Sequence, residues 1–127
     1  MTATLSRRRG AQKAYGQIHR STMLGRPAEA EAFARAAALL TQANNSPHDR
    51  RLLSDALAFN QKLWTIMEAE VSDPSHPAPA GIKHDMMALA DYMDQTMAEV
   101  VTGRGVGRLD GMIAVNASLS KGLFAAS

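Results

Sequence analysis

The feature of this sequence that most limits its fold is the helical spacing of its apolar residues, which recurs between clusters of turn-forming residues. The clusters occupy residues 42–47, 72–79 and 103–107 and are rich in asparagine, proline or glycine. Between them, apolar side chains return every three or four residues, which places them on one face of an α-helix. The sequence predicts helices over about 27–43, 47–71, 79–101 and 108–124.

Local signals set the expected ends of these helices. Ser46 is predicted to cap the start of the second helix, because its hydroxyl can accept a bond from a free backbone N–H. Gly103 is predicted to close the third helix by adopting the left-handed conformation. A further short helix is predicted around Ala11 to Ile18, where apolar residues again follow a helical spacing.

Composition agrees with an all-α fold. Aromatic residues make up only 5% of the chain, whereas alanine and the eight methionines favour helices over strands. Amphipathic helices joined by short connections favour a small antiparallel bundle of four to five helices in which consecutive helices are neighbours. We expect residues 11–124 to form this single domain and residues 1–10 to form a basic, flexible arm.

Charge is distributed unevenly along the chain. Residues 1–28 hold six of the 14 basic residues and no acidic residue, so the remaining eight basic and 12 acidic residues give a net charge of −4. The basic arm around Arg7, Arg8 and Arg9 could contact nucleic acid or an acidic partner, or it could be a solvated terminus.

Nothing in the sequence predicts an enzyme, a cofactor or a metal site. The chain has no cysteine, and its four histidines are far apart. The Gly103–Gly107 loop follows no predicted strand and lacks the Gly-Lys-Ser/Thr ending of a phosphate-binding loop. No apolar run approaches the roughly 20 residues that span a bilayer. We expect a cytoplasmic protein that acts by binding another protein.

Some residues stand out as candidates for contact with that partner. Asn60 and Asn116 interrupt apolar stripes, and each must hydrogen-bond to backbone or to the other if it is buried. Methionine is flexible and suits a groove for varied helices, although any methionine can equally belong to the core. The residues predicted to bind a partner are Tyr15, Asn60, Trp64, Met93, Met97 and Asn116.

Four motifs follow one another along the chain at characteristic spacings. They are Ala14-Tyr15, Glu29-x-x-x-Phe33-x-x-x-Ala37, Leu57-x-x-Asn60-x-x-Leu63-Trp64 and Ile113-x-x-Asn116-x-x-Leu119-x-x-Gly122-Leu123. Their order and spacing resemble the FlaF family of flagellar regulators, and the resemblance covers roughly Ala14 to Leu123. At the start of the third predicted helix the family usually has Leu-Pro where this chain has Ala78-Pro79.

This resemblance implies a factor that promotes flagellin synthesis and secretion without catalysis or a cofactor. It implies binding of flagellin as an export chaperone, since the disordered ends of free flagellin become amphipathic helices in the filament. It also implies action alongside FlbT, a regulator that restrains translation of flagellin mRNA. Two alternatives stay open: binding of the flagellin mRNA leader through the basic arm, and binding of FlbT with no contact to flagellin.

Overall fold

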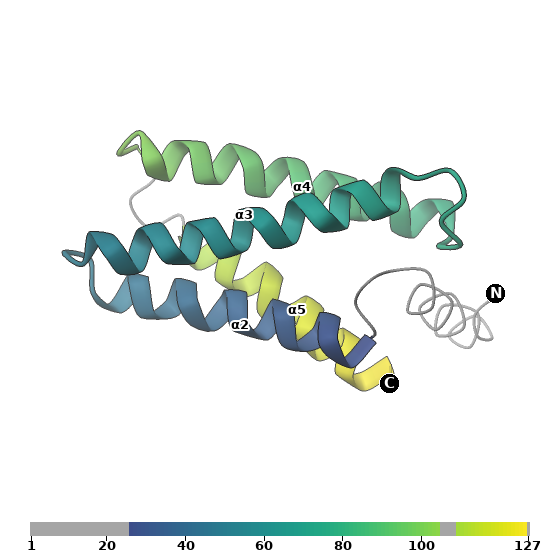
Figure 1. Cartoon of the computed structure of the whole chain (residues 1–127), viewed down its shortest axis with the longest axis horizontal. Helices are drawn as coiled ribbons and strands as arrows, with labels where there is room; N and C mark the ends of the chain where they lie inside the picture. The colour runs from purple at the N-terminus through teal and green to yellow at the C-terminus, as the bar shows by residue number, and fades with distance from the viewer. Residues whose placement is uncertain (1–25, 105–108, 127) are drawn as a thin grey trace.

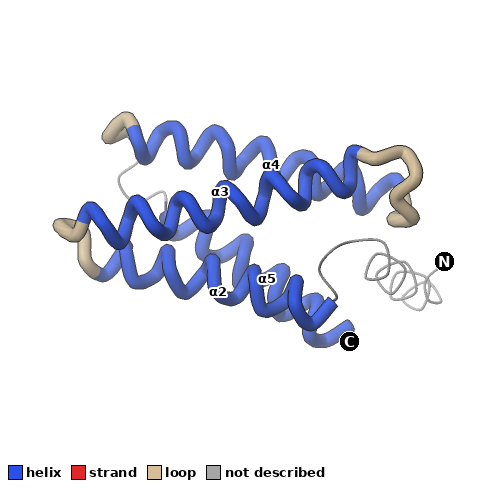
Figure 2. Tube along the Cα trace, in the orientation of Figure 1, coloured by secondary structure: helices blue, strands red, loops and turns tan. Residues whose placement is uncertain are grey.

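The computed structural model describes residues 26–104 and 109–126, with side chains from residue 28 to residue 122 within those ranges. It contains four α-helices and, in the described part, no strand, which confirms the predicted all-α bundle (Figures 1 and 2). The predicted short helix at 11–18, Tyr15 and the basic arm lie outside the described residues. The helices are α2 (Arg26–Asn45), α3 (Arg50–Ser72), α4 (Ala80–Val101) and α5 (Leu109–Ala126).

The start of α3 differs from the sequence prediction. Asp49, not Ser46, is the N-cap, and its carboxylate accepts a 3.0 Å hydrogen bond from the backbone N–H of Leu52. The carbonyl of Ser46 instead accepts a 2.9 Å bond from the N–H of Asp49, which closes a turn. Ser46 therefore begins the connection from α2 to α3, and the prediction that it caps α3 is wrong because the turn that follows it delays the helix.

The end of α4 follows the prediction. Gly103 has a φ of +82°, a left-handed conformation that costs glycine little. Its N–H bonds to the carbonyl of Val100 at 3.1 Å, and the N–H of Arg104 bonds to the carbonyl of Glu99 at 3.0 Å. These two bonds form a Schellman motif, which satisfies carbonyls that the helix end would otherwise leave free.

The helices are not all neighbours in chain order. α3 packs between α2 and α4, whereas α5 packs most extensively on α2 and touches α4 at few points (Figure 1). The expectation that consecutive helices are neighbours is therefore wrong for α4 and α5. α2 offers α5 a close fit, because Ser120 donates a 2.7 Å bond to the backbone carbonyl of Ala30 and Asn44 donates a 3.1 Å bond to Asp110.

A core of apolar side chains from all four helices holds the bundle together. Phe33 and Trp64 meet edge to face, with their ring centroids 5.5 Å apart, where α2 crosses α3. Burying one large apolar side chain stabilises a fold by about 1.5–3 kcal/mol. The largest fully buried apolar side chains are Trp64, Phe33, Leu40, Met93 and Met112.

Candidate functional site

A chain of polar side chains crosses the core from α3 to α5. Asn60 and Asn116 are both completely buried. The amide of Asn116 donates a 2.8 Å hydrogen bond to the carbonyl oxygen of Asn60, and the indole N–H of Trp64 donates a 3.0 Å bond to the carbonyl oxygen of Asn116. Of the two arrangements open from sequence, bonding to backbone or to each other, the structure shows the second for this pair.

Methionine sulfurs surround the remaining amide group of Asn60. Its Nδ2 lies 3.5 Å from the sulfurs of Met93 and Met97 on α4 and 3.9 Å from that of Met112 on α5. Thioether sulfur is a weak acceptor, so these contacts compensate in part for the loss of water at the amide. Three helices therefore converge on one buried asparagine.

This geometry places five of the six predicted partner-binding residues in the core. Their side chains are at most 8% exposed, the largest value being that of Met97. A direct contact with a partner would require the helices to separate, so their predicted role in binding stays a prediction. The five residues are Asn60, Trp64, Met93, Met97 and Asn116; the sixth, Tyr15, lies outside the described residues.

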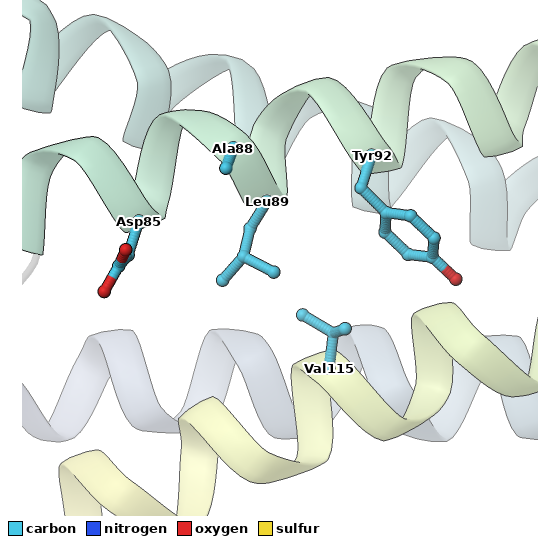
Figure 3. A pocket seen from close by; sticks show the side chains of 5 residues that line it. All are labelled: Asp85, Ala88, Leu89, Tyr92 and Val115. Atoms are coloured by element: carbon cyan, nitrogen blue, oxygen red, sulfur yellow. The ribbon is translucent and has the colours of Figure 1, made fainter.

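The surface between α4 and α5 is different, because these two helices leave a groove between them. Leu89 and Tyr92 extend from α4 toward α5, and Val115 extends from α5 toward α4 (Figure 3). Asp85 and Ala88 complete the lining of this depression, which is mostly apolar and measures about 470 Å³. A second depression of about 290 Å³ shares Leu89 and Val115 with the first.

The second depression continues the groove along α5. Its further lining residues are Ala114, Ser118 and Leu119. Both depressions are wide open to solvent, whereas small-molecule sites enclose most of their ligand. We define the α4–α5 groove as these two depressions together. An open apolar groove between two helices fits the apolar face of a third helix better than it fits a metabolite.

Tyr92 closes the groove toward the start of α5. A Cβ atom on residue 111 would overlap the Tyr92 hydroxyl, so glycine at that position lets the phenol lie across α5. Leu89 and Leu119 belong to the helically spaced apolar residues of the predicted helices 79–101 and 108–124, but that spacing does not separate groove residues from core residues. Sequence analysis missed Tyr92 and Val115, although a tyrosine next to a stripe is a typical boundary between core and surface.

The connection from α3 to α4 holds the one buried side-chain atom of the described residues that has no hydrogen-bond partner, His76 Nε2. The other ring nitrogen accepts a 3.3 Å bond from the N–H of Ala78. Burial, and next the positive charge of Lys83, lowers the pKa of His76 below 6.5. Hydrogen bonds from Ser75 lower the pKa of Asp73 below 3.8. Burial in this loop therefore favours the neutral form of His76.

The described residues show neither a metal site nor a membrane-spanning helix. They contain no group of three histidine, cysteine, aspartate or glutamate side chains that could hold a metal ion. Within the same ranges, no helix is both long and apolar enough to cross a membrane. A depression at residues 45–50 is larger, at about 740 Å³, but its lining is more polar than that of the α4–α5 groove. The α4–α5 groove is therefore the better candidate of the two for binding an apolar helix.

The described residues form a small all-α bundle with an open, mostly apolar groove between α4 and α5. A family model described as "Flagellar protein FlaF" matches residues 11–123. The chain therefore belongs to the FlaF family of flagellar proteins, as the motifs indicated. The arm at Arg7–Arg9 lies outside the match. Comparison with curated proteins and comparison with solved structures each found no match.

Proposed function

We propose that this flagellar protein binds flagellin in the cytoplasm as an export chaperone and acts alongside FlbT. The observation that carries the proposal is the α4–α5 groove, in which Leu89, Val115 and Leu119 are only half-buried between two helices that touch at few points. Its proposed occupant is an amphipathic terminal helix of flagellin. The protein would act by binding alone, without catalysis or a cofactor.

Helix-in-groove packing explains how such a groove would act. The apolar face of a flagellin end would aggregate or assemble early if it stayed in water, and covering it with the groove prevents both. Ordering a flexible segment costs conformational entropy, which keeps the affinity moderate. Moderate affinity suits a chaperone, because flagellin must leave before it is exported.

The buried asparagine network supports the groove from beneath. Asn116 lies next in the chain to the groove residue Val115, and its bonds to Asn60 and Trp64 hold α5 against α3. On α4, the buried Met93 is likewise the neighbour in sequence of a groove residue, Tyr92. Residues that sequence analysis assigned to partner contact would then position the groove without touching the partner.

Co-purification with monomeric flagellin at low and high salt tests this function. Packing of apolar surfaces tolerates salt, so the complex should survive at both concentrations. Binding of the mRNA leader would weaken steeply as salt rises, because phosphate contacts release counterions. A protein that retains FlbT but no flagellin at either concentration would contradict the chaperone function and favour the FlbT alternative.

A further inference from the structure

We propose that the α4–α5 groove takes an amphipathic helix that carries a basic residue beside its apolar face, held against Asp85. The groove would then select its occupant by charge as well as by apolar packing. The inference rests on the proposed function, because it names the chemistry of the helix that this groove binds. Its first test uses synthetic peptides and needs no flagellin.

The length of the groove sets the number of apolar side chains that an occupant can insert. The lining on α4 runs from Asp85 to Tyr92, which is about two helical turns, or roughly 11 Å. A helix that packs along such a groove inserts apolar side chains that are three or four residues apart, so two turns hold about three of them. The residues that flank these anchors on the occupant therefore lie at the ends of the groove.

The two ends of the groove differ in chemistry. Asp85 and Tyr92 lie at opposite ends of the row of α4 side chains, with Leu89 between them (Figure 3). Tyr92 is half-buried, and its hydroxyl lies next to Gly111 of α5. Asp85 is exposed and is the only charged residue among those that line the two depressions. An occupant therefore meets a charge at the Asp85 end.

The carboxylate of Asp85 is available to an occupant. No other described residue forms a hydrogen bond or an ion pair with it. A helix that enters the groove removes water from this carboxylate, which is unfavourable unless a polar or basic group compensates. A basic side chain on the occupant supplies that compensation, whereas an acidic side chain at the same place adds repulsion.

The two helices that form the groove extend this preference for positive charge. α4 has four acidic residues and one lysine, a net charge of −3 with His84 neutral, while Asp110 and Lys121 of α5 cancel each other. The lysine of α4, Lys83, donates a 3.2 Å bond to the backbone carbonyl of Asp73 and is thus held at the α3–α4 connection. A basic helix is therefore attracted to this side of the bundle before it makes contact.

The same charge disfavours a second copy of this chain as the occupant. Two copies that met through their grooves would bring two negatively charged α4 helices together, and like charges repel. The free protein should therefore be a monomer in analytical ultracentrifugation. A dimer that a lysine-bearing helical peptide fails to dissociate would overturn the inference.

An exchange of charge between peptide and protein tests the inference. Two helical peptides of about 18 residues carry the same apolar anchors, flanked at both ends by lysine in one and by glutamate in the other. Either direction of binding then places a flanking residue at Asp85. Fluorescence anisotropy of the labelled peptides measures their affinity for the full-length protein at low salt. Exposed charge pairs change an equilibrium by up to about fivefold, and attraction is here replaced by repulsion, so the lysine peptide should bind about tenfold more tightly.

Two variants of α4 test whether Asp85 causes this preference. Asp85→Lys should reverse it, so that the glutamate peptide binds more tightly. Asp91→Lys is the matched control, because Asp91 is exposed on the same helix, does not line the groove and gives the same change in net charge. The control should still prefer the lysine peptide. Equal effects of the two variants, or no preference in the unmodified protein, would overturn the inference.

Monomeric flagellin, titrated with the same variants, separates this inference from the proposed function. Asp85→Lys should weaken flagellin binding by about fivefold or more, and Asp91→Lys should weaken it less. If Ala114→Glu weakens flagellin binding and Asp85→Lys does not, the inference fails and the proposed function stands. If the peptides show the charge preference and flagellin does not bind, the proposed function fails and the inference stands.

Discussion

The amide of Asn116 donates a 2.8 Å hydrogen bond to the carbonyl of Asn60, which joins α5 to α3 inside the core. α5 otherwise rests mainly on α2, so this bond fixes its position relative to the rest of the bundle. The side-chain carbonyl oxygen of Asn116 accepts a bond from the indole N–H of Trp64, so this one side chain bonds to two partners. Buried polar groups of this kind specify a unique packing only while every member is satisfied.

Replacing Asn116 with alanine should destabilise the protein by about 2–3 kcal/mol, because it leaves Trp64 and Asn60 with buried, unpaired polar atoms. Urea unfolding measures the change in the free energy of unfolding. Asn44→Ala is the control, since its bond to Asp110 is exposed to solvent and should be worth well under 1 kcal/mol. Equal losses in the two variants would contradict the role assigned to the network.

Met93→Asp should unfold the protein instead of removing a partner contact selectively. Met93 is completely buried, and an unpaired carboxylate there should cost about 4 kcal/mol or more. Met93→Leu should stay within about 1.5 kcal/mol of the native stability. Circular dichroism during heating compares the two. A Met93→Asp protein that keeps its native helicity and midpoint would show that this side chain is not part of the core.

Two glycine substitutions should shift the stability in opposite directions. Gly103→Ala forces a side chain into the left-handed conformation at the end of α4 and should cost about 1–2 kcal/mol. Gly122→Ala lies on α5, where a Cβ meets nothing within 4 Å, and should gain about 0.5–1 kcal/mol. Thermal midpoints report both changes. Shifts of the same sign would contradict the described end of α4 or the open environment of residue 122.

The protein should lose stability as the pH falls below 6.5. Burial lowers the pKa of His76, so the unfolded chain binds a proton that the folded chain resists. The contribution of His76 is complete above its unfolded pKa of 6.5 and is lost as the pH falls through the lower folded pKa. The ring signals of His76, followed by NMR, should titrate below pH 6.5. A midpoint at or above 6.5 would contradict its burial.

The helices could be predicted from the sequence because periodicity and turn clusters are local. The left-handed conformation of Gly103 could be predicted for the same reason, because it depends only on the glycine itself and on the helix that precedes it. The prediction for Ser46 was wrong because both Ser46 and Asp49 can cap a helix. The turn between these two residues delays the start of α3, so that Asp49 is the residue in the capping position. Propensity alone could not choose between them.

The groove could not be predicted because it depends on which helices become neighbours. Leu89 and Met93 are four residues apart in the sequence, a spacing that places them on one side of a helix. In the structure, however, Met93 contacts Asn60 of α3, while Leu89 lines the open side toward α5. That difference follows from α5 packing on α2 instead of α4, a tertiary choice that no local pattern encodes. For the same reason, sequence analysis assigned partner contact to residues that the structure buries.

The most direct measurement is a titration of monomeric flagellin with two matched variants, Ala114→Glu and Ala58→Glu. Both alanines are exposed on helices, so both variants should fold, but only Ala114 lines the α4–α5 groove. If flagellin binds in the groove, Ala114→Glu should weaken binding at least tenfold while Ala58→Glu leaves it unchanged. Equal affinity of the two variants would contradict the groove as the flagellin site.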